Sequence, residues 1–302
     1  MNKVRFFPLA VALLSSISPA LLLADADDAP AGKTISVSAF GLLNERSKYF
    51  QDWFPEPFRV EDTAVDNELK FDWEHDEGKQ SRADQITAEI QKSVGIVTFE
   101  IQAPYVISTG PDHDDTEDAS HIQRTEGFGD IELAARVPIH QFVSSTGFFD
   151  NSVGLNVEVG MPTNTRFGKN TEIGPGIFDD LAIGEHFSLQ ALFSLASLVG
   201  PTRGGRDSFE YGLAFGYVIE DEEVRLPRIE RLIPSVELVG ETTLDGANIG
   251  HNALTGTVGL RFEFKPIGRL QPQFGIGYVF PVDKGGSEEI RWGVITGLVV
   301  EF

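Results

Sequence analysis

The sequence predicts an all-β fold, a transmembrane antiparallel up-and-down β-barrel of about twelve strands. Three observations lead to this prediction. Apolar residues alternate with polar or small ones at short intervals along 66–302, which is the side-chain period of a strand. The predicted strands mostly run for about 10 to 14 residues, longer than soluble strands and long enough to cross a bilayer at a tilt. The face opposite the large apolar residues carries glycine and charged side chains.

Composition narrows the class of protein. The chain has 302 residues, of which 41% are hydrophobic and 23% charged, including 23 Phe. It is therefore too polar for a helical membrane protein and too rich in phenylalanine to be wholly disordered. A net charge of -22 argues against a nucleic-acid partner. The absence of cysteine from the sequence excludes disulfide scaffolds, thiolate zinc sites and cysteine nucleophiles.

The first 26 residues have the features of a secretory signal peptide. Lys3 and Arg5 precede an apolar stretch over 6–23, and a small-x-small cleavage site ends at Ala26. An uncleaved anchor helix is the alternative, but two prolines interrupt a run already marginal for spanning a bilayer. We therefore expect cleavage after residues 1–26 and a mature chain outside the cytoplasm.

Residues 27–65 come before the barrel and carry a group of aromatic side chains among prolines and charges. The residues singled out are Tyr49, Phe50, Trp53 and Phe54. One interpretation is a plug that folds into the barrel and closes its lumen. The other is a periplasmic arm or an extra strand. The sequence leaves both open.

The barrel itself is expected over 66–302. In the first strand Leu69, Phe71 and Trp73 share one face, and charged residues alternate with them on the other. The last strand repeats the pattern and ends at Phe302, which resembles the closing strand that the barrel-assembly machinery recognises. The predicted strands lie near 66–75, 82–91, 95–106, 127–138, 152–161, 172–184, 186–199, 208–219, 232–242, 253–264, 269–280 and 289–302.

Alternation alone does not say which face points inward, since a soluble lipocalin-like barrel would alternate too. Such a barrel has little reason to expose rows of glycine, which weaken strands. A barrel with its apolar face outward, here called an inverted barrel, accounts for both faces of the strands. The Phe, Leu and Val side chains then contact lipid, and the Glu, Arg, Gln and Gly residues face the interior.

Connection lengths give partial support for this orientation. Tight inner turns are expected at 92–94, 184–185 and 265–268, and polar outer connections at 76–81, 107–126, 162–171, 200–207, 243–252 and 281–288. Two inner connections, 139–151 and 220–231, are longer than the short-turn rule predicts.

Acidic residues predominate among those expected to face the lumen. As a pore lining, this excess favours cations and neutral solutes over anions. The alternative is that the same residues form internal ion pairs that brace the barrel. The lumen-lining candidates are Glu68, Asp72, Asp130, Glu132, Arg136, Glu158, Glu210, Glu237, Glu241, Arg261, Glu263 and Arg291.

Three further functions are compatible with particular residues. Loop 107–126 is rich in Asp and could hold calcium, but it lacks the glycine of an EF-hand-like loop. A solvated acidic loop is therefore favoured, and no metal or cofactor is predicted. Outer-membrane phospholipases use a Ser–His–Asn group, but neither His186 nor His251 has a matching motif, so an enzyme is not expected. A non-conducting structural or surface-interaction barrel remains the main alternative to a channel.

The block GFGDIELAARV at 127–137, together with the later Gly-rich strands and the closing Phe302, resembles the phenol-degradation MetA-pathway transporter-like family of outer-membrane barrels. The specific match is limited to this block, and Pro138 breaks it where an aromatic-rich strand would continue. The resemblance implies a channel for small, often hydrophobic or aromatic molecules in the bacterial outer membrane. The partners would be membrane lipid, lipopolysaccharide, the barrel-assembly machinery and a small-molecule solute.

Overall fold

The computed structural model describes residues 43–302 apart from 45, 52, 62, 80, 112–121, 164–169, 200–206 and 247. The predicted signal peptide 1–26, residues 27–42 and the acidic centre of loop 107–126 lie outside the described residues. The described residues belong to one compact unit.

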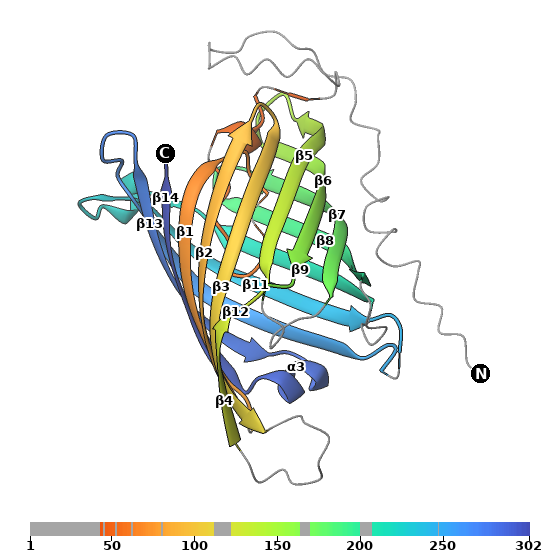
Figure 1. The fold of residues 1–302 in the computed structure, drawn as a ribbon. Coiled ribbons are helices and arrows are strands. Elements are labelled where there is room, and N and C mark those ends of the chain that lie inside the picture. The colour runs from red at the N-terminus through yellow and green to blue at the C-terminus, as the bar shows by residue number, and fades with distance from the viewer. Residues whose placement is uncertain are drawn as a thin grey trace. The chain divides into compact units, whose positions relative to one another are not determined.

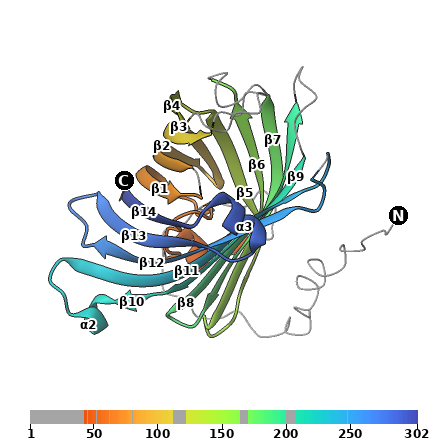
Figure 2. The ribbon, with the colours of Figure 1, turned by 90° about the horizontal axis from the view of Figure 1, so that it is seen from below.

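The described residues form a closed antiparallel β-barrel, which confirms the predicted fold class (Figures 1 and 2). Fourteen strands are distinguished, but β4 with β5 and β9 with β10 each make one interrupted strand, so the barrel has twelve. The first strand pairs with the last, from Glu68 opposite Glu301 to Glu77 opposite Trp292. Closure of this kind leaves no strand edge with unpaired backbone N–H and C=O groups. A sheet in lipid requires such closure, because lipid offers these groups no hydrogen-bond partner.

The strand bounds follow the predicted ranges closely. They are β1 Asn67–Glu77, β2 Arg82–Val94, β3 Val97–Pro111, β4 Ile122–Phe128, β5 Ile131–Val143, β6 Phe149–Met161, β7 Thr171–Ile183, β8 Phe187–Val199, β9 Ser208–Tyr217, β10 Ile219–Glu220, β11 Ile229–Thr243, β12 Asn252–Phe264, β13 Gln271–Pro281 and β14 Trp292–Glu301. The short helices are η2 Lys48–Phe50, α2 Asp221–Val224 and α3 Lys284–Glu289. No helix among the residues with a described placement is long and apolar enough to cross a membrane.

Large apolar side chains point outward. Phe215 and Leu298 are each 46% exposed, whereas the charged residues Glu237 and Arg261 are at most 1% exposed. A soluble barrel would show the opposite distribution, because a continuous apolar belt in water is costly. The alternation therefore produces an inverted barrel, with lipid as the natural solvent of its outer face.

The two ends of the barrel differ. The "turn end" carries the short connections, including 95–96 and 184–186, and the "loop end" carries the longer ones, including the connection that contains α3. In Figure 1 the loop end is the lower one, where α3 and β4 are labelled.

Two connections depart from the prediction. The expected long connection over 139–151 is short, because β5 continues past Pro138 through an irregularity in register between Pro138 and His140. A proline lacks the N–H that a strand needs, and a bulge absorbs that defect. The expected loop over 281–288 contains α3, capped at its N-terminus by the Asp283 side chain.

Candidate functional site in the barrel interior

Residues 43–66, here called the inner segment, run through the interior of the barrel. Near its start Lys48 Nζ donates to the carbonyl oxygen of Gly184, 2.7 Å away at the turn end. The segment reaches furthest toward the loop end at Phe58–Val60, and near Asp66 it returns to the turn end, where the Asp66 carbonyl accepts from Ser93 Oγ at 2.7 Å. It forms a hairpin-like insertion that contains no β-strand in its described residues.

A single carboxylate on β11 holds the tip of this insertion. The backbone N–H groups of Phe58, Arg59 and Val60 donate to the two oxygens of Glu237, at 2.7, 2.8 and 3.3 Å. Glu237 is fully buried. A buried carboxylate is costly unless it is satisfied by donors of this kind, so the tip and Glu237 depend on each other.

The aromatic residues predicted as a plug lie together inside the barrel. Tyr49, Trp53 and Phe54 are buried in one apolar cluster, and Phe50 packs against it. The Tyr49 ring stacks on Phe178 of β7 with centroids 5.9 Å apart. The other members of the cluster are Val60, Ala182, Leu192, Ala214, Val218 and Ile233.

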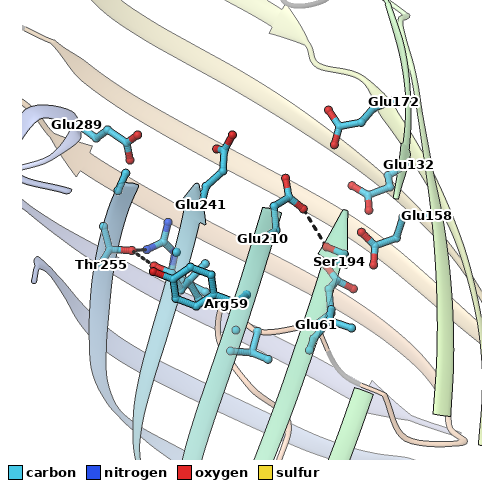
Figure 3. Close-up of a pocket in the computed structure, with 17 residues that line it drawn as sticks. Arg59, Glu61, Glu132, Glu158, Glu172, Ser194, Glu210, Glu241, Thr255 and Glu289 are labelled. Carbon is cyan, nitrogen blue, oxygen red and sulfur yellow. Dashed lines mark hydrogen bonds between the residues drawn. The ribbon is translucent and has the colours of Figure 1, made fainter. Parts of the chain in front are cut away.

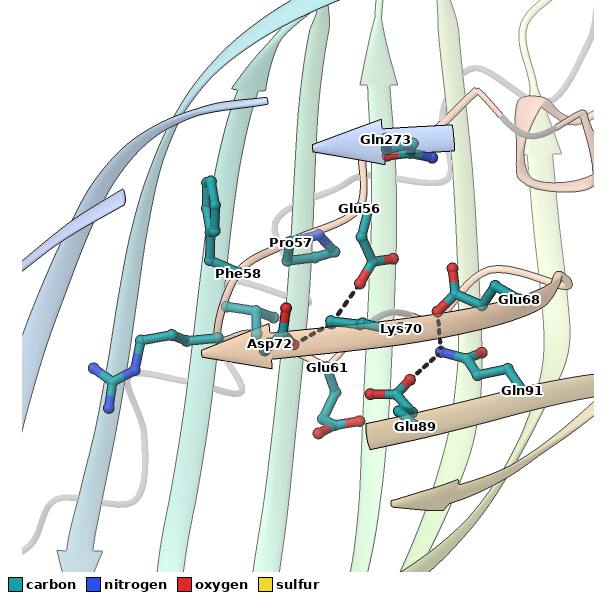
Figure 4. Close-up of polar contacts among 12 residues, drawn as sticks. Glu56, Pro57, Phe58, Glu61, Glu68, Lys70, Asp72, Glu89, Gln91 and Gln273 are labelled. Atoms are coloured by element: carbon teal, nitrogen blue, oxygen red, sulfur yellow. Dashed lines mark hydrogen bonds and ion pairs between the residues drawn. The ribbon is translucent and has the colours of Figure 1, made fainter. Parts of the chain in front are cut away.

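Charged contacts tie the inner segment to the wall. Lys70 of β1 lies 2.5 Å from Glu56, and both side chains are at most 7% exposed (Figure 4). Arg136 of β5 pairs with Glu61 and also with Glu100 of β3, at 2.7 Å in the latter case. Each buried wall cation here therefore has a carboxylate partner, as burial of charge requires.

Glycines on the inner face make room for the segment. A Cβ atom at Gly275 would lie 2.6 Å from the Phe58 ring, and one at Gly212 would lie 3.1 Å from Val60. The Phe58 ring also covers the guanidinium of Arg261, whose carbon is 4.8 Å from the ring centroid. The glycine rows thus permit close approach of another part of the same chain.

Between the tip of the inner segment and the loop end lies a cavity of about 370 Å³, here called the chamber (Figure 3). Seven glutamates and one arginine are among its lining residues. The charged lining residues are Arg59, Glu61, Glu132, Glu158, Glu172, Glu210, Glu241 and Glu289. Arg59 and Glu61 belong to the tip, so the inner segment forms part of the chamber wall.

Helix α3 contributes Glu289 to the chamber. Burial raises the pKa of Glu289, and the neighbouring Glu241 carboxylate raises it further. Burial acts in the same direction on Asp283, but hydrogen bonds from the backbone N–H groups of Gly286 and Leu254 and from Asn252 outweigh it and lower the pKa of Asp283. Asp283 thereby ties the N-terminus of α3 to β12.

The predicted lumen-lining residues fall into three groups. Glu132, Glu158, Glu210 and Glu241 line the chamber. Glu68, Arg136, Glu237, Arg261 and Glu263 are buried, and Asp72 lies 3.7 Å from Lys70 with its side chain 15% exposed. Arg291 and Asp130 form the third group, outside the strands. Arg291 precedes β14 and is exposed. Asp130 lies in the break between β4 and β5, where its carboxylate accepts a hydrogen bond from the backbone N–H of Thr163.

Thirteen of the seventeen lining residues were absent from the predicted set, including the charged residues Arg59, Glu61, Glu172 and Glu289. Glu172 continues the polar face of β7, a signal that the alternation contained. Ser194 and Thr255 carry no charge, and Arg59 lies outside the strands, so strand periodicity gave no reason to select them.

The histidines with described contacts do not form a nucleophilic group. His75 Nδ1 lies 2.9 Å from Asp84, His186 Nδ1 lies 2.8 Å from the Val218 carbonyl oxygen, and His251 Nε2 lies 3.3 Å from Glu288. None of these contacts involves a serine. Among the residues that the structure describes, no group of three or more His, Asp or Glu is arranged to hold a metal ion.

Comparison with known proteins gives a likeness of fold. No protein-family model and no curated protein matches the chain. The COG4313 outer membrane channel from Pseudomonas putida F1 is similar in structure, with a TM-score of 0.56 and 13% identity, over 82% of this chain and 100% of that chain. The NanC porin (TM-score 0.42, 7% identity, over 78% of this chain and 98% of that chain) and OprD from Pseudomonas aeruginosa (TM-score 0.34, 8% identity, 78% and 94%) share less of the fold.

The closed barrel, its apolar outer face and this likeness of fold give the chain the architecture of an outer-membrane β-barrel.

Proposed function

We propose that this protein is a channel through which small molecules cross the outer membrane. The observation that carries the proposal is the chamber, a space of about 370 Å³ inside the barrel wall whose base is formed by a segment that joins no sheet in its described residues. A segment held by side-chain contacts and by backbone donors to one carboxylate can leave without breaking the barrel's strand ladder. We propose that the inner segment, with Tyr49, Phe50, Trp53 and Phe54, is the plug of this channel.

The charge of the chamber supports a preference for cations and neutral solutes over anions. Seven carboxylates and one guanidinium line the chamber, and these carboxylates are half-buried or exposed, so permeating ions would meet their field directly. The hydrophobic or aromatic solutes implied by the MetA-pathway resemblance find less support, since the apolar part of the lining is limited to side chains such as Val60, Leu192 and Val239.

Purified protein reconstituted in planar bilayers tests the proposal. We expect discrete single-channel currents and a reversal potential in a KCl gradient that indicates preference for K⁺. Preference for Cl⁻ would contradict the proposed lining. Complete absence of conductance across a range of voltages and pH values would favour the second candidate.

That second candidate is a non-conducting structural or surface-interaction barrel. The packing of the inner segment favours it, because the turn-end half of the lumen is filled by the apolar cluster and by the ion pairs of the inner segment.

For either candidate function we propose that the outer face contacts membrane lipid and lipopolysaccharide. We also propose that the barrel-assembly machinery recognises the last strand, which ends at Phe302.

A further inference from the structure

The Arg59 side chain at the tip of the inner segment connects two separated strands of the wall. Its Nε lies 3.2 Å from Glu74 Oε1 on β1, and its Nη1 donates to Thr255 Oγ1 on β12 at 2.8 Å. In the sheet, β13 and β14 lie between these strands. Arg59 therefore ties the tip to the wall at two points that the Glu237 contacts do not use.

Arg59 is also the only basic residue among those described as lining the chamber. Arg261, a wall cation close to the tip, is 1% exposed beneath the Phe58 ring and is not part of that lining. The positive charge within the chamber lining is thus carried by the plug and not by the wall. Movement of the tip would move that charge.

The docking of the tip can be separated from the action of Arg59. Glu237 accepts only from backbone N–H groups, one of them that of Arg59 itself. A change in the Arg59 side chain therefore leaves the three backbone donors in place. What it removes is the tie to Glu74 and Thr255 and the positive charge.

We propose that Arg59 determines both how long the channel stays closed and how strongly it prefers cations. This inference rests on the proposed channel function. Its contacts with Glu74 and Thr255 hold the tip in the closed position. Its charge offsets part of the carboxylate field, so that the chamber is less cation-selective with Arg59 present than without it.

Three variants separate the two roles in planar bilayers. Arg59→Gln removes both the tie and the charge, Glu74→Gln weakens the tie and keeps the charge of Arg59, and Arg59→Lys keeps the charge with altered geometry. The ion pair stabilises the closed state, so losing one partly exposed pair should raise the open fraction, the fraction of time that the channel conducts, about fivefold. We expect that increase for Arg59→Gln and for Glu74→Gln.

Selectivity distinguishes these variants. We expect the K⁺ to Cl⁻ permeability ratio to rise about twofold for Arg59→Gln, as expected for removal of one fixed charge among several. It should stay at the wild-type value for Arg59→Lys and should not rise for Glu74→Gln. Thr255→Val serves as a neutral variant that weakens the tie alone, should Glu74→Gln fail to fold by circular dichroism.

An Arg59→Gln channel with wild-type open fraction and wild-type permeability ratio would overturn the inference while leaving the channel function intact. An equal rise in cation preference for Glu74→Gln would also overturn it, since the charge of Arg59 is unchanged in that variant. If neither wild type nor any folded variant conducts, the proposed function itself fails. These results are distinguishable in one set of recordings.

Discussion

The two halves of the barrel interior use charged residues in different ways. In the turn-end half, Lys70 and Arg136 are almost fully buried, and each contacts a carboxylate of the inner segment. In the loop-end half, seven glutamates and one arginine line the chamber; Glu61 is the one that pairs with Arg136, while Glu241 and Glu289 are exposed. The wall residues of both sets lie on the inward face of strands, whereas Arg59 and Glu61 belong to the inner segment and Glu289 to α3.

The difference shows how water access determines what an interior charge does. Where the inner segment excludes water, an ionised group is tolerated only with a partner, and the pair braces the structure. Where water enters, a carboxylate stays solvated without a cation beside it and is free to act on solutes. The bracing and the pore-lining interpretations of the acidic residues therefore apply to different halves of the lumen.

The largest expected effect comes from breaking a buried pair. Arg136→Met removes the cation between Glu61 and Glu100 and leaves Glu100 buried without its partner. We expect a loss of about 3–5 kcal/mol in unfolding free energy, measured by urea titration in phospholipid vesicles. Glu172→Gln in the chamber is the matched control, and it should change stability little. Equal losses for the two variants would show that the halves do not differ.

A smaller effect is expected from filling the space that the inner segment occupies. Gly275→Val places side-chain atoms against Phe58, where even a Cβ atom would be only 2.6 Å from the ring. We expect overpacking to cost about 1–3 kcal/mol of segment docking, detected as faster proteolysis of the segment in folded protein. Gly174→Val is the control, because its nearest contacts are 3.6 and 3.7 Å away, on Glu158. Unchanged proteolysis in Gly275→Val would contradict docking at this place.

The smallest effect concerns the loop-end helix α3 and its pH dependence. The pKa of Glu289 is raised in the docked state, so its contribution to docking is full at low pH and is lost as the pH rises through that raised value. Asp283 acts in the opposite sense, since its lowered pKa means that its contribution is lost as the pH falls through that lowered value. Docking of α3 should be strongest between these two values.

Hydrogen exchange of the α3 amides, corrected for the intrinsic pH dependence of exchange, measures this effect. Because Glu289 is partly exposed, we expect it to contribute no more than about 1 kcal/mol after solvent screening. Glu289→Gln should remove the increase in exchange toward neutral pH, whereas Glu172→Gln should retain it. Persistence of the increase in Glu289→Gln would assign it to another group.

Much of the wall could be predicted from sequence because each strand repeats the same local rule. The alternation of Leu69, Phe71 and Trp73 with charged neighbours placed these side chains outward, and the structure leaves all three exposed. Pro138 misled the prediction of one connection, because the bulge that accommodates it depends on pairing with β6. The helix α3 was missed for a related reason, since its glycines pack against the β12 backbone.

The interior contacts could not be predicted in the same way. The partners Glu56 and Lys70 are close in sequence, but Glu61 and Arg136 are 75 positions apart and belong to different kinds of structure. Nothing in the strand period indicates that Arg59 would reach the chamber. The aromatic residues at 49–54 suggested a plug and an external arm equally, because aromatic clusters occur in both.

The sequence by itself determined the barrel, most of its strand limits and the outward direction of its apolar face, since the period of two couples each side chain to lipid or lumen locally. Tertiary structure alone decided which interior charges are paired and which face water. The physical reason is that solvation depends on what fills the space beside a side chain, and here that space is filled by residues 43–66, which follow no strand period.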